Sequence, residues 1–402
     1  MSGAEAPGDD AGVVAVIVTA ATAREPLAVF GNGGKRAMLR PVQAARGLST
    51  RNLSGITLYS PAELVISARA GSELPEIEAA LAAHGQHLIA EPPDLGPLLG
   101  AATPPTLGGT VAANLSGPRR IAAGAMRDHV LGVRAVNGEG TVIHSGGRVL
   151  KNVAGLDLCK MLAGSHGTLA VMTEITLKVL PAPESTATLT IPGLDVAQGV
   201  AVLAAALGSP FGVSGAAYLP AAAAARMPEL GAAGEGVALA RLENFAPSVA
   251  YRAGRLAAEL TRFGPPRLVK DAESRFIWRA IRDAKPLPAA EADAIWRVSI
   301  RPSAAPGLVG ALAATGAGWF LDWGGGLVWI AAAAEASTHR AITAAASAAG
   351  GAWTLLRAPE ALRAGLDVLP PPPPALARLT RRVKAAFDPH GILNPGRMYA
   401  GI

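Results

Sequence analysis

The stretch TPPTLGGTVAANLSGPRR, residues 103–120, decides the fold that we expect of this chain. It holds three glycines among many small residues and closes on Arg119 and Arg120, and it contains no acid, histidine or cysteine. A glycine lets backbone N–H groups approach a phosphate or an aromatic ring that a β-carbon would push away. One such run is commonly an ordinary turn, so its interpretation depends on whether the chain repeats the pattern.

The chain does repeat it, in three further clusters of small residues. These are GNGGK (31–35), GAMRDHVLG (124–132) and GSHGTL (164–169). Several clusters in one part of the chain favour a large, flat, charged ligand that lies along the backbone, and a flavin dinucleotide has that shape. Ordinary turns in a chain with 47 glycines are the alternative.

Common motifs of other nucleotide and hydrolase sites are absent. The sequence has no G-x-x-x-x-G-K-[ST], G-x-G-x-x-G, G-x-S-x-G or H-E-x-x-H. A Walker-type nucleotide hydrolase, a standard dinucleotide fold and a serine hydrolase therefore lose support. The single cysteine, Cys159, excludes an internal disulfide and an iron–sulfur or cysteine-rich zinc site built from this chain alone, and we expect no metal site.

Composition indicates a globular protein of two or three domains. The chain has 402 residues, half of them hydrophobic, and a formal charge of +6. Its arginines are scattered and aromatic residues make up only 4%, so we expect no nucleic-acid partner. The first ten residues are small and acidic, and glycines and prolines interrupt the uncharged segment 196–225. We therefore expect a cytoplasmic protein without a membrane anchor of its own.

Hydrophobic patterning predicts alternating helices and strands in the first half. Helices are expected at 11–23 and 75–85, the second with proline in its first turn and glycine just past its end. Strands are expected before the glycines at 31–36, within 63–74, at 129–137 followed by a hairpin at Asn137–Gly138, and at 167–181 as one long strand or two.

The texture changes near residue 183. Alanine-rich helical pieces then alternate with short strands at 296–302 and 325–331. Five prolines at 370–374 form a stiff spacer before a helix with Leu376, Leu379, Val383 and Phe387 on one face. We expect an α+β protein with domains at 1–182 and 183–365, followed by a linker, helix and tail at 366–402.

At the glycine clusters the sequence resembles the vanillyl-alcohol-oxidase, or PCMH-type, superfamily of FAD-binding proteins. Within it, the chain is most similar to the FAD-binding subunits of bacterial glycolate oxidases. The motifs that carry the resemblance are GNGGKRAMLRP (31–41), LSTRNLSGI (48–56), YSPAELVISARAG (59–71), EPPDLG (91–96), PTLGGTVAANLSGPRR (105–120), residues 126–181 and FDPHGILNPGRMY (387–399). The resemblance implies two β-subdomains that cradle FAD, a cap of mixed sheet and helices, and a C-terminal helix and tail that return to the FAD domain.

The resemblance also implies which residues contact the cofactor. The first loop, expected around the pyrophosphate, comprises Gly31, Asn32, Gly33, Gly34 and Lys35. The second segment comprises Thr106, Gly108, Gly109, Asn114, Ser116 and Gly117. The third comprises Gly164, Ser165, Gly167, Thr168 and Val171, and the C-terminal signature adds Asn394 and Arg397.

Two departures from relatives bear on the chemistry. The first loop has no histidine, to which some relatives attach FAD, so we expect non-covalent FAD. Catalytic relatives that act on 2-hydroxy acids carry a metal-binding histidine pair in the cap, and this chain lacks that segment. Its catalytic residues are therefore unknown, and Arg297 and Arg301 are weak candidates for binding a substrate carboxylate.

Three functional hypotheses follow. The first is an FAD-binding subunit of a glycolate oxidase or dehydrogenase complex that oxidises glycolate to glyoxylate. Its partners would be a catalytic flavin subunit and an iron–sulfur subunit, through which the complex would associate peripherally with the inner face of the membrane. The alternatives are a self-sufficient FAD-dependent 2-hydroxy-acid dehydrogenase and a non-catalytic flavin-binding assembly subunit.

Overall fold

The computed structural model describes residues 3–147, 156–231 and 234–402 of the chain, and it divides into two compact units. Unit 1 comprises Met1–Ser116, Ala125–Ala182 and Pro371–Ile402. Unit 2 comprises Gly117–Gly124 and Pro183–Pro370. The segment 117–124, which begins with the last four residues of the stretch 103–120, therefore folds with unit 2 although it is flanked on both sides by unit 1.

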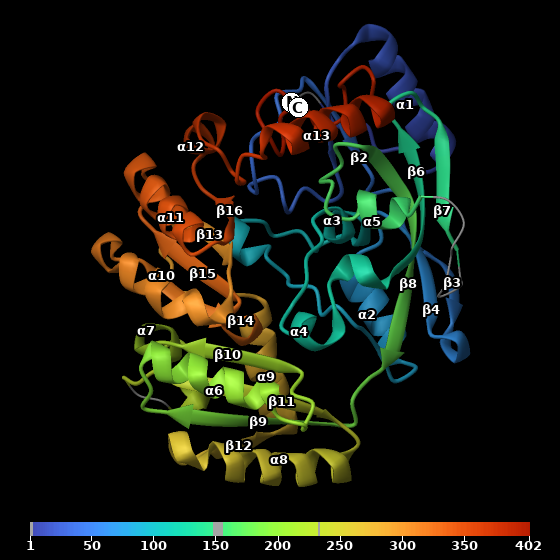
Figure 1. The fold of residues 1–402 in the computed structure, drawn as a ribbon. Helices are drawn as coiled ribbons and strands as arrows, with labels where there is room; N and C mark the ends of the chain where they lie inside the picture. Colours follow the sequence, from blue (N-terminus) through green and yellow to red (C-terminus); the bar gives the residue numbers. More distant parts are fainter. Residues whose placement is uncertain (1–2, 148–155, 232–233) are drawn as a thin grey trace. The chain divides into compact units, whose positions relative to one another are not determined.

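Unit 1 is built on an antiparallel sheet and a small parallel pair of strands (Figure 1). The sheet runs in the order β3 (Ile56–Ser60), β4 (Val65–Arg69), β8 (Ala170–Pro181), β6 (Val130–Asn137), β7 (Val142–Gly146), and β5 (Gln86–Leu88) pairs with the end of β8. The parallel pair is β1 (Leu27–Phe30) and β2 (Arg46–Ser49). The segment predicted as one strand or two at 167–181 forms the single strand β8, which pairs with β4 and β6.

Five α-helices accompany these strands in the described part of unit 1. They are α1 (Asp10–Ala23), α2 (Leu74–Ala82), α3 (Leu107–Ala112), α5 (Leu158–Leu162) and α13 (Pro374–Phe387), with 3-10 turns at Pro61–Glu63, Pro97–Leu99 and Met126–His129. Four of them bury apolar side chains, whereas Leu376 and Leu379 of the fifth, α13, are exposed. Ile77 and Leu81 of α2 join one buried core with Ile175 of β8. Val13 and Ile17 of α1 join a second core with residues of β1, β8 and the C-terminal tail. The helix predicted at 11–23 is thus confirmed, and the helix predicted at 75–85 is confirmed with an earlier end, at Ala82.

Unit 2 is built on one eight-stranded antiparallel sheet (Figure 1). Its order is β12 (Arg267–Lys270), β9 (Ser185–Pro192), β11 (Val237–Asn244), β10 (Gly215–Leu219), β14 (Gly318–Asp322), β15 (Leu327–Ala332), β13 (Ala294–Ser299), β16 (Ala352–Arg357). Its α-helices are α4 (Arg120–Ala123), α6 (Val196–Gly208), α7 (Ala221–Ala224), α8 (Ala246–Leu260), α9 (Asp271–Arg282), α10 (Ala305–Ala311), α11 (Ala336–Ala348) and α12 (Glu360–Gly365). The 3-10 turns are η4 (Pro228–Leu230), η5 (Thr261–Phe263), η6 (Pro302–Ala304), η7 (Ala313–Thr315) and η8 (Trp323–Gly325).

The two faces of this sheet carry different chemistry. On one face, Tyr218 lies against Gly199 of α6, and the Trp296 indole donates to His339 Nδ1 of α11 at 3.2 Å. On the other face, Arg241 stacks on the Trp278 ring of α9. Because strand side chains alternate, Arg297 lies on the same face as Arg241, opposite Trp296.

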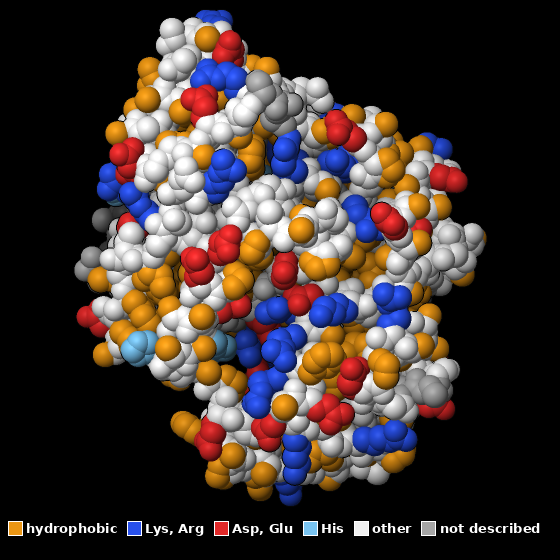
Figure 2. Space-filling model, turned by 180° about the vertical axis from the view of Figure 1, so that it is seen from behind, with side chains coloured by type: hydrophobic (Ala, Val, Ile, Leu, Met, Phe, Trp, Pro, Cys, Tyr) orange, Lys and Arg blue, Asp and Glu red, His pale blue; other side chains and the backbone are white. Residues whose placement is uncertain are grey.

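The uncharged segment 196–225 folds as globular structure, with α6, β10 and α7 contributing largely buried side chains. Asp195 caps α6 through a reciprocal pair of hydrogen bonds with Gln198. In the part of the chain that the structure describes, no helix combines the length and the apolarity needed to cross a membrane. On the face drawn in Figure 2, Lys and Arg side chains are interleaved with Asp and Glu side chains.

Candidate functional site

In unit 1, the first predicted loop packs closely against the second predicted segment. The Asn32 amide donates to Glu73 Oε1 at 3.0 Å and to the carbonyl of Pro104 at 3.2 Å. A β-carbon at Gly31 would lie 2.2 Å from Thr106 Oγ1, far inside contact distance. Gly33 adopts a φ of +82°, which favours glycine. The glycines therefore allow the loop to turn sharply and to touch the second segment.

The second segment forms the start of the short helix α3. Thr106 caps that helix by accepting a hydrogen bond from Gly109 N at 3.2 Å. Gly108 lies against the backbone of Ala70, where a β-carbon would come within 2.8 Å of the carbonyl oxygen. Asn114 and Ser116 accept bonds from Arg127 N and Met126 N at 3.0 and 2.9 Å. The side chains of this segment therefore hold backbone N–H groups, and Gly108 allows the segment to pack closely on Ala70.

The third segment is a run of left-handed backbone conformations. Gly164, His166 and Gly167 have φ angles of +91°, +52° and +70°. The Ser165 and Thr168 hydroxyls donate to the carbonyls of Leu162 and Ser165 at 2.8 and 2.7 Å. Val171 differs from the other predicted residues of this segment, because it belongs to β8 and its side chain is buried in a hydrophobic core.

The C-terminal tail ties the first loop to the third segment. Asn394 Oδ1 accepts from Val29 N at 2.7 Å, and its Nδ2 donates to the carbonyls of Val29 and His166 at 3.1 and 2.9 Å. The Arg397 guanidinium donates to the carbonyls of Lys35 and Arg40 at 2.7 and 2.8 Å. Both side chains are buried and hold the loop backbones in place.

Three basic side chains of these segments act on one another electrostatically. Burial lowers the pKa of Lys35 to about 8, although the charge of Asp94 opposes the shift. Burial and the positive charges of Arg397 and Lys35 lower the pKa of His166 to about 3. Among the described residues, the Lys35 ammonium has no hydrogen bond or ion pair, and it lies near Gly109. Such a desolvated cation without a bonded carboxylate fits an anionic group such as a pyrophosphate.

The remaining predicted residues lie in unit 2. The carbonyl of Gly117 accepts a hydrogen bond from Trp323 Nε1 at 3.0 Å. Arg301 is exposed next to η6, whereas Arg297 is half-buried on β13. The structure thus places Lys35 beside the second segment, and the tail joins the first loop to the third segment. The two arginines differ in exposure, since Arg301 is exposed and Arg297 is half-buried.

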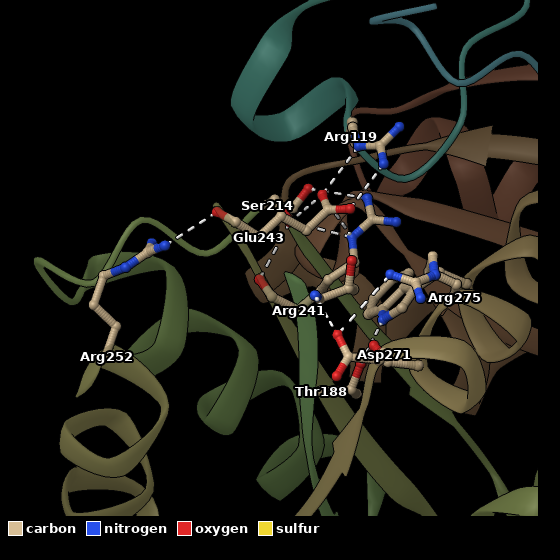
Figure 3. Close-up of polar contacts among 11 residues, drawn as sticks. Arg119, Thr188, Ser214, Arg241, Glu243, Arg252, Asp271 and Arg275 are labelled. Atoms are coloured by element: carbon tan, nitrogen blue, oxygen red, sulfur yellow. Dashed lines mark hydrogen bonds and ion pairs between the residues drawn. The ribbon is translucent and has the colours of Figure 1, made fainter. Parts of the chain in front are cut away.

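Arg119 has a partner within the protein. Its guanidinium donates to Glu243 through Nε at 3.0 Å and Nη2 at 2.7 Å (Figure 3). Glu243 also accepts from the Ser214 hydroxyl at 2.8 Å and lies 3.3 Å from Arg241 Nε. The negative charge that Arg119 offsets is therefore a protein carboxylate, and this pair fixes the segment 117–124 to the sheet of unit 2.

Sequence reasoning missed Lys384, which lies on α13. Its buried ammonium donates to Asp388 Oδ2 at 2.6 Å and to the carbonyls of Thr168 and Leu393 at 2.7 Å each. The available signal was the Lys–Asp spacing of four residues at the end of an amphipathic helix. Lys384 joins the third segment to the tail, and so it supports the site without entering it.

Comparison with known proteins agrees with this architecture. The FAD binding domain family matches residues 2–146, and the C-terminal domain family of FAD linked oxidases matches residues 373–398. The glycolate oxidase subunit GlcE of Escherichia coli K12 is 35% identical over 377 residues, which cover 94% of this chain and 93% of that protein. A D-lactate dehydrogenase of Archaeoglobus fulgidus is 34% identical over 152 residues, covering 38% of this chain and 32% of that protein.

Solved structures share the fold at low sequence identity. A p-cresol methylhydroxylase with substrate bound matches 98% of this chain and 88% of that chain with a TM-score of 0.71 and 15% identity. A 4-ethylphenol oxidase from Gulosibacter chungangensis matches with a TM-score of 0.70 over the same shares and 12% identity. These likenesses confirm the predicted α+β, PCMH-type fold.

Proposed function

Because this chain belongs to the family of the glycolate oxidase subunit GlcE, we propose that it is the FAD-binding subunit of a glycolate oxidase or dehydrogenase complex. The match runs over nearly the whole of both chains, so the proposal covers the second unit as well as the FAD-binding domain. The observation in the structure that supports it best is the desolvated Lys35 ammonium beside the glycines of α3, without a bonded carboxylate.

The residues of unit 1 have distinct tasks in this proposal. Lys35 supplies a positive charge for the pyrophosphate, and Gly109, beside the Lys35 ammonium, lets the cofactor approach the backbone, while Gly108 lets α3 pack on Ala70. Arg397 and Asn394 act as positioning residues, because their polar atoms hold the loop carbonyls. His166 is neutral at pH 7, since its pKa is about 3, and offers hydrogen bonds rather than charge.

Bound FAD would supply a two-electron acceptor for the oxidation of a hydroxyl-bearing carbon. The chain's residues would bind and orient it non-covalently, because the loop 31–40 has no histidine for attachment. Denaturation of the holoprotein with trichloroacetic acid should leave the flavin in the supernatant. Flavin that stays in the protein pellet would overturn the non-covalent part of the proposal.

The partners belong to the proposal too. This sequence lacks the metal-binding histidine pair of catalytic relatives, so we assign substrate oxidation to a second flavin subunit and onward electron transfer to an iron–sulfur subunit. The complex would work on small 2-hydroxy acids in the cytoplasm or at the inner face of the membrane, where its partners would hold it.

An anaerobic visible spectrum of the purified chain tests the proposal. The chain should carry oxidised flavin bands that persist when glycolate is added and bleach once the partner subunits are present. Bleaching of the isolated chain would instead support a self-sufficient 2-hydroxy-acid dehydrogenase. Flavin that is never reduced in the working complex would support an assembly subunit, and absence of flavin after reconstitution with FAD would overturn the cofactor assignment.

A further inference from the structure

The sheet of unit 2 carries a half-buried cation beside aromatic side chains, outside the cofactor site. Arg297 of β13 is paired in register with Trp329 of β15, which is paired with Phe320 of β14. The three side chains therefore form one row on the face of the sheet that also carries Arg241. The Phe320 and Trp329 rings are stacked with centroids 6.1 Å apart.

Two hydrogen-bond donors in this row have no partner. Arg297 Nε and Trp329 Nε1 are buried, and neither makes a hydrogen bond within the described part of the chain. Trp329 is only 2% exposed, so its indole N–H cannot be satisfied by bulk water. Unsatisfied buried donors are rare and costly, and two of them in one row indicate a place where a bound group would be stabilised.

Positive charge gathers at the same place. The Arg297 guanidinium carbon lies 5.0 Å from the ring centre of Trp329 and 5.3 Å from that of Trp323. The Arg120 guanidinium carbon lies 4.5 Å from the ring centre of Trp323. Burial and the charge of Arg120 lower the pKa of Arg297 to about 10, although Asp322 opposes the shift.

We propose that Arg297, Trp329 and Arg120 form a binding site for the carboxylate of a small 2-hydroxy acid. A guanidinium and an indole N–H supply two donors that match the two oxygens of one carboxylate, and Arg120 adds charge. The rings of Phe320 and Trp329 are 0% and 2% exposed, so both donors lie beside surfaces that bulk water does not reach. The choice of a 2-hydroxy acid rests on the proposed function, whereas the anion site rests on the residues of unit 2 alone.

The test is a calorimetric titration of the full chain with glycolate, both FAD-loaded and FAD-free. Wild-type protein should bind glycolate, and Arg297→Met should weaken binding at least tenfold because a charge-assisted hydrogen bond is lost. Arg340→Met is the matched control, because Arg340 is an exposed arginine on α11 of the same unit and belongs to no proposed site. That variant should bind glycolate like the wild type.

Two further measurements keep the outcome clear. Methyl glycolate, which lacks the carboxylate, should bind at least tenfold more weakly than glycolate, and Arg297→Lys, which keeps charge but loses Nε, should restore binding only in part. Thermal unfolding of Arg297→Met should match or exceed that of the wild type, since a desolvated cation is removed.

Several results would overturn the inference. These are equal glycolate affinity of Arg297→Met and the wild type, no glycolate binding by the wild type, and chloride binding as tightly as glycolate. These results can be told apart from a failure of the proposed function, because the FAD-free chain is titrated as well. A failure of the proposed function would appear as absence of bound flavin or of flavin reduction.

Discussion

The surroundings of the Lys35 side chain lead us to expect that it binds an anionic group of FAD. Its pKa of about 8 reflects burial that no bonded carboxylate offsets. We expect Lys35→Met to lower the affinity for FAD by roughly 10- to 100-fold, the value of one charge-assisted hydrogen bond of about 1.5–3 kcal/mol. Titration of FAD with the apoprotein, followed by the quenching of FAD fluorescence, measures this affinity. Lys178→Met, on β8 and remote in sequence from the loops, should bind FAD normally, and equal affinity of the two variants would refute the phosphate role.

The same lysine predicts a pH dependence. Before FAD binds, the Lys35 pKa is about 8, and a bound phosphate would raise it, so binding takes up a proton above pH 8. FAD affinity of the wild type should therefore fall as the pH rises from 7 to beyond 8. Lys35→Met should lose this dependence, and a wild-type affinity that is constant from pH 7 to 9.5 would contradict the assignment.

Site residues could be predicted from the sequence where the local backbone requires a particular residue type. They were harder to predict where a side chain contacts residues far away in the sequence. The glycines of the first and third segments predict tight turns, and Gly33, Gly164 and Gly167 do adopt positive φ. Arg397 is different, because it binds the carbonyls of Lys35, Arg36 and Arg40 more than 350 residues earlier. No local pattern encodes such a contact, so only the resemblance pointed to that residue.

At the scale of elements, the contact between the first loop and α3 depends on one missing side chain. We expect Gly31→Ala to separate them, because the new β-carbon would lie 2.2 Å from Thr106 Oγ1. The loss should be about 1–3 kcal/mol in the free energy of unfolding, as for other overpacked sites. FAD affinity should fall with it. Gly8→Ala, which has open space around it, is the control for urea unfolding.

Elements themselves were largely predictable, since periodicity and turn residues are local signals. The hairpin expected at Asn137–Gly138 joins β6 and β7, and the strand expected at 325–331 is β15, Leu327–Ala332. Within 63–74 the strand is shorter than expected, because Pro61–Glu63 form a 3-10 turn and Leu64 is left-handed. Periodicity cannot place such an end, which depends on backbone bonds between Leu64 and both Pro61 and Val179.

For the molecule as a whole, the division into units is not readable along the chain. Residues 117–124 belong to unit 2 through the contact of Arg119 with Glu243, and residues 371–402 belong to unit 1 through Lys384, Asn394 and Arg397. These ties join segments more than 100 residues apart. Composition does change near residue 183, but a change in composition cannot reveal an excursion of a few residues into another unit.

The buried Glu243 makes the stability of unit 2 sensitive to acid. Burial by itself would raise the pKa of Glu243, but the charges of Arg241 and Arg119 outweigh it and lower that pKa to about 2, from 4.5. A lowered carboxyl pKa stabilises the fold above the unfolded value and loses that contribution as the pH falls from about 4.5 toward 2. The shift corresponds to about 3 kcal/mol.

Glu243→Gln should therefore be less stable than the wild type at pH 7, and it should lose less stability between pH 5 and pH 3. Urea unfolding at several pH values measures both effects, and hydrogen exchange of the β11 amides assigns them to unit 2. Glu259→Gln, exposed on α8, is the matched control and should follow the wild type at every pH. If Glu243→Gln lost as much stability in acid as the wild type, another carboxyl group would be responsible. Arg119 and Arg241 would then hold Glu243 without making unit 2 sensitive to acid.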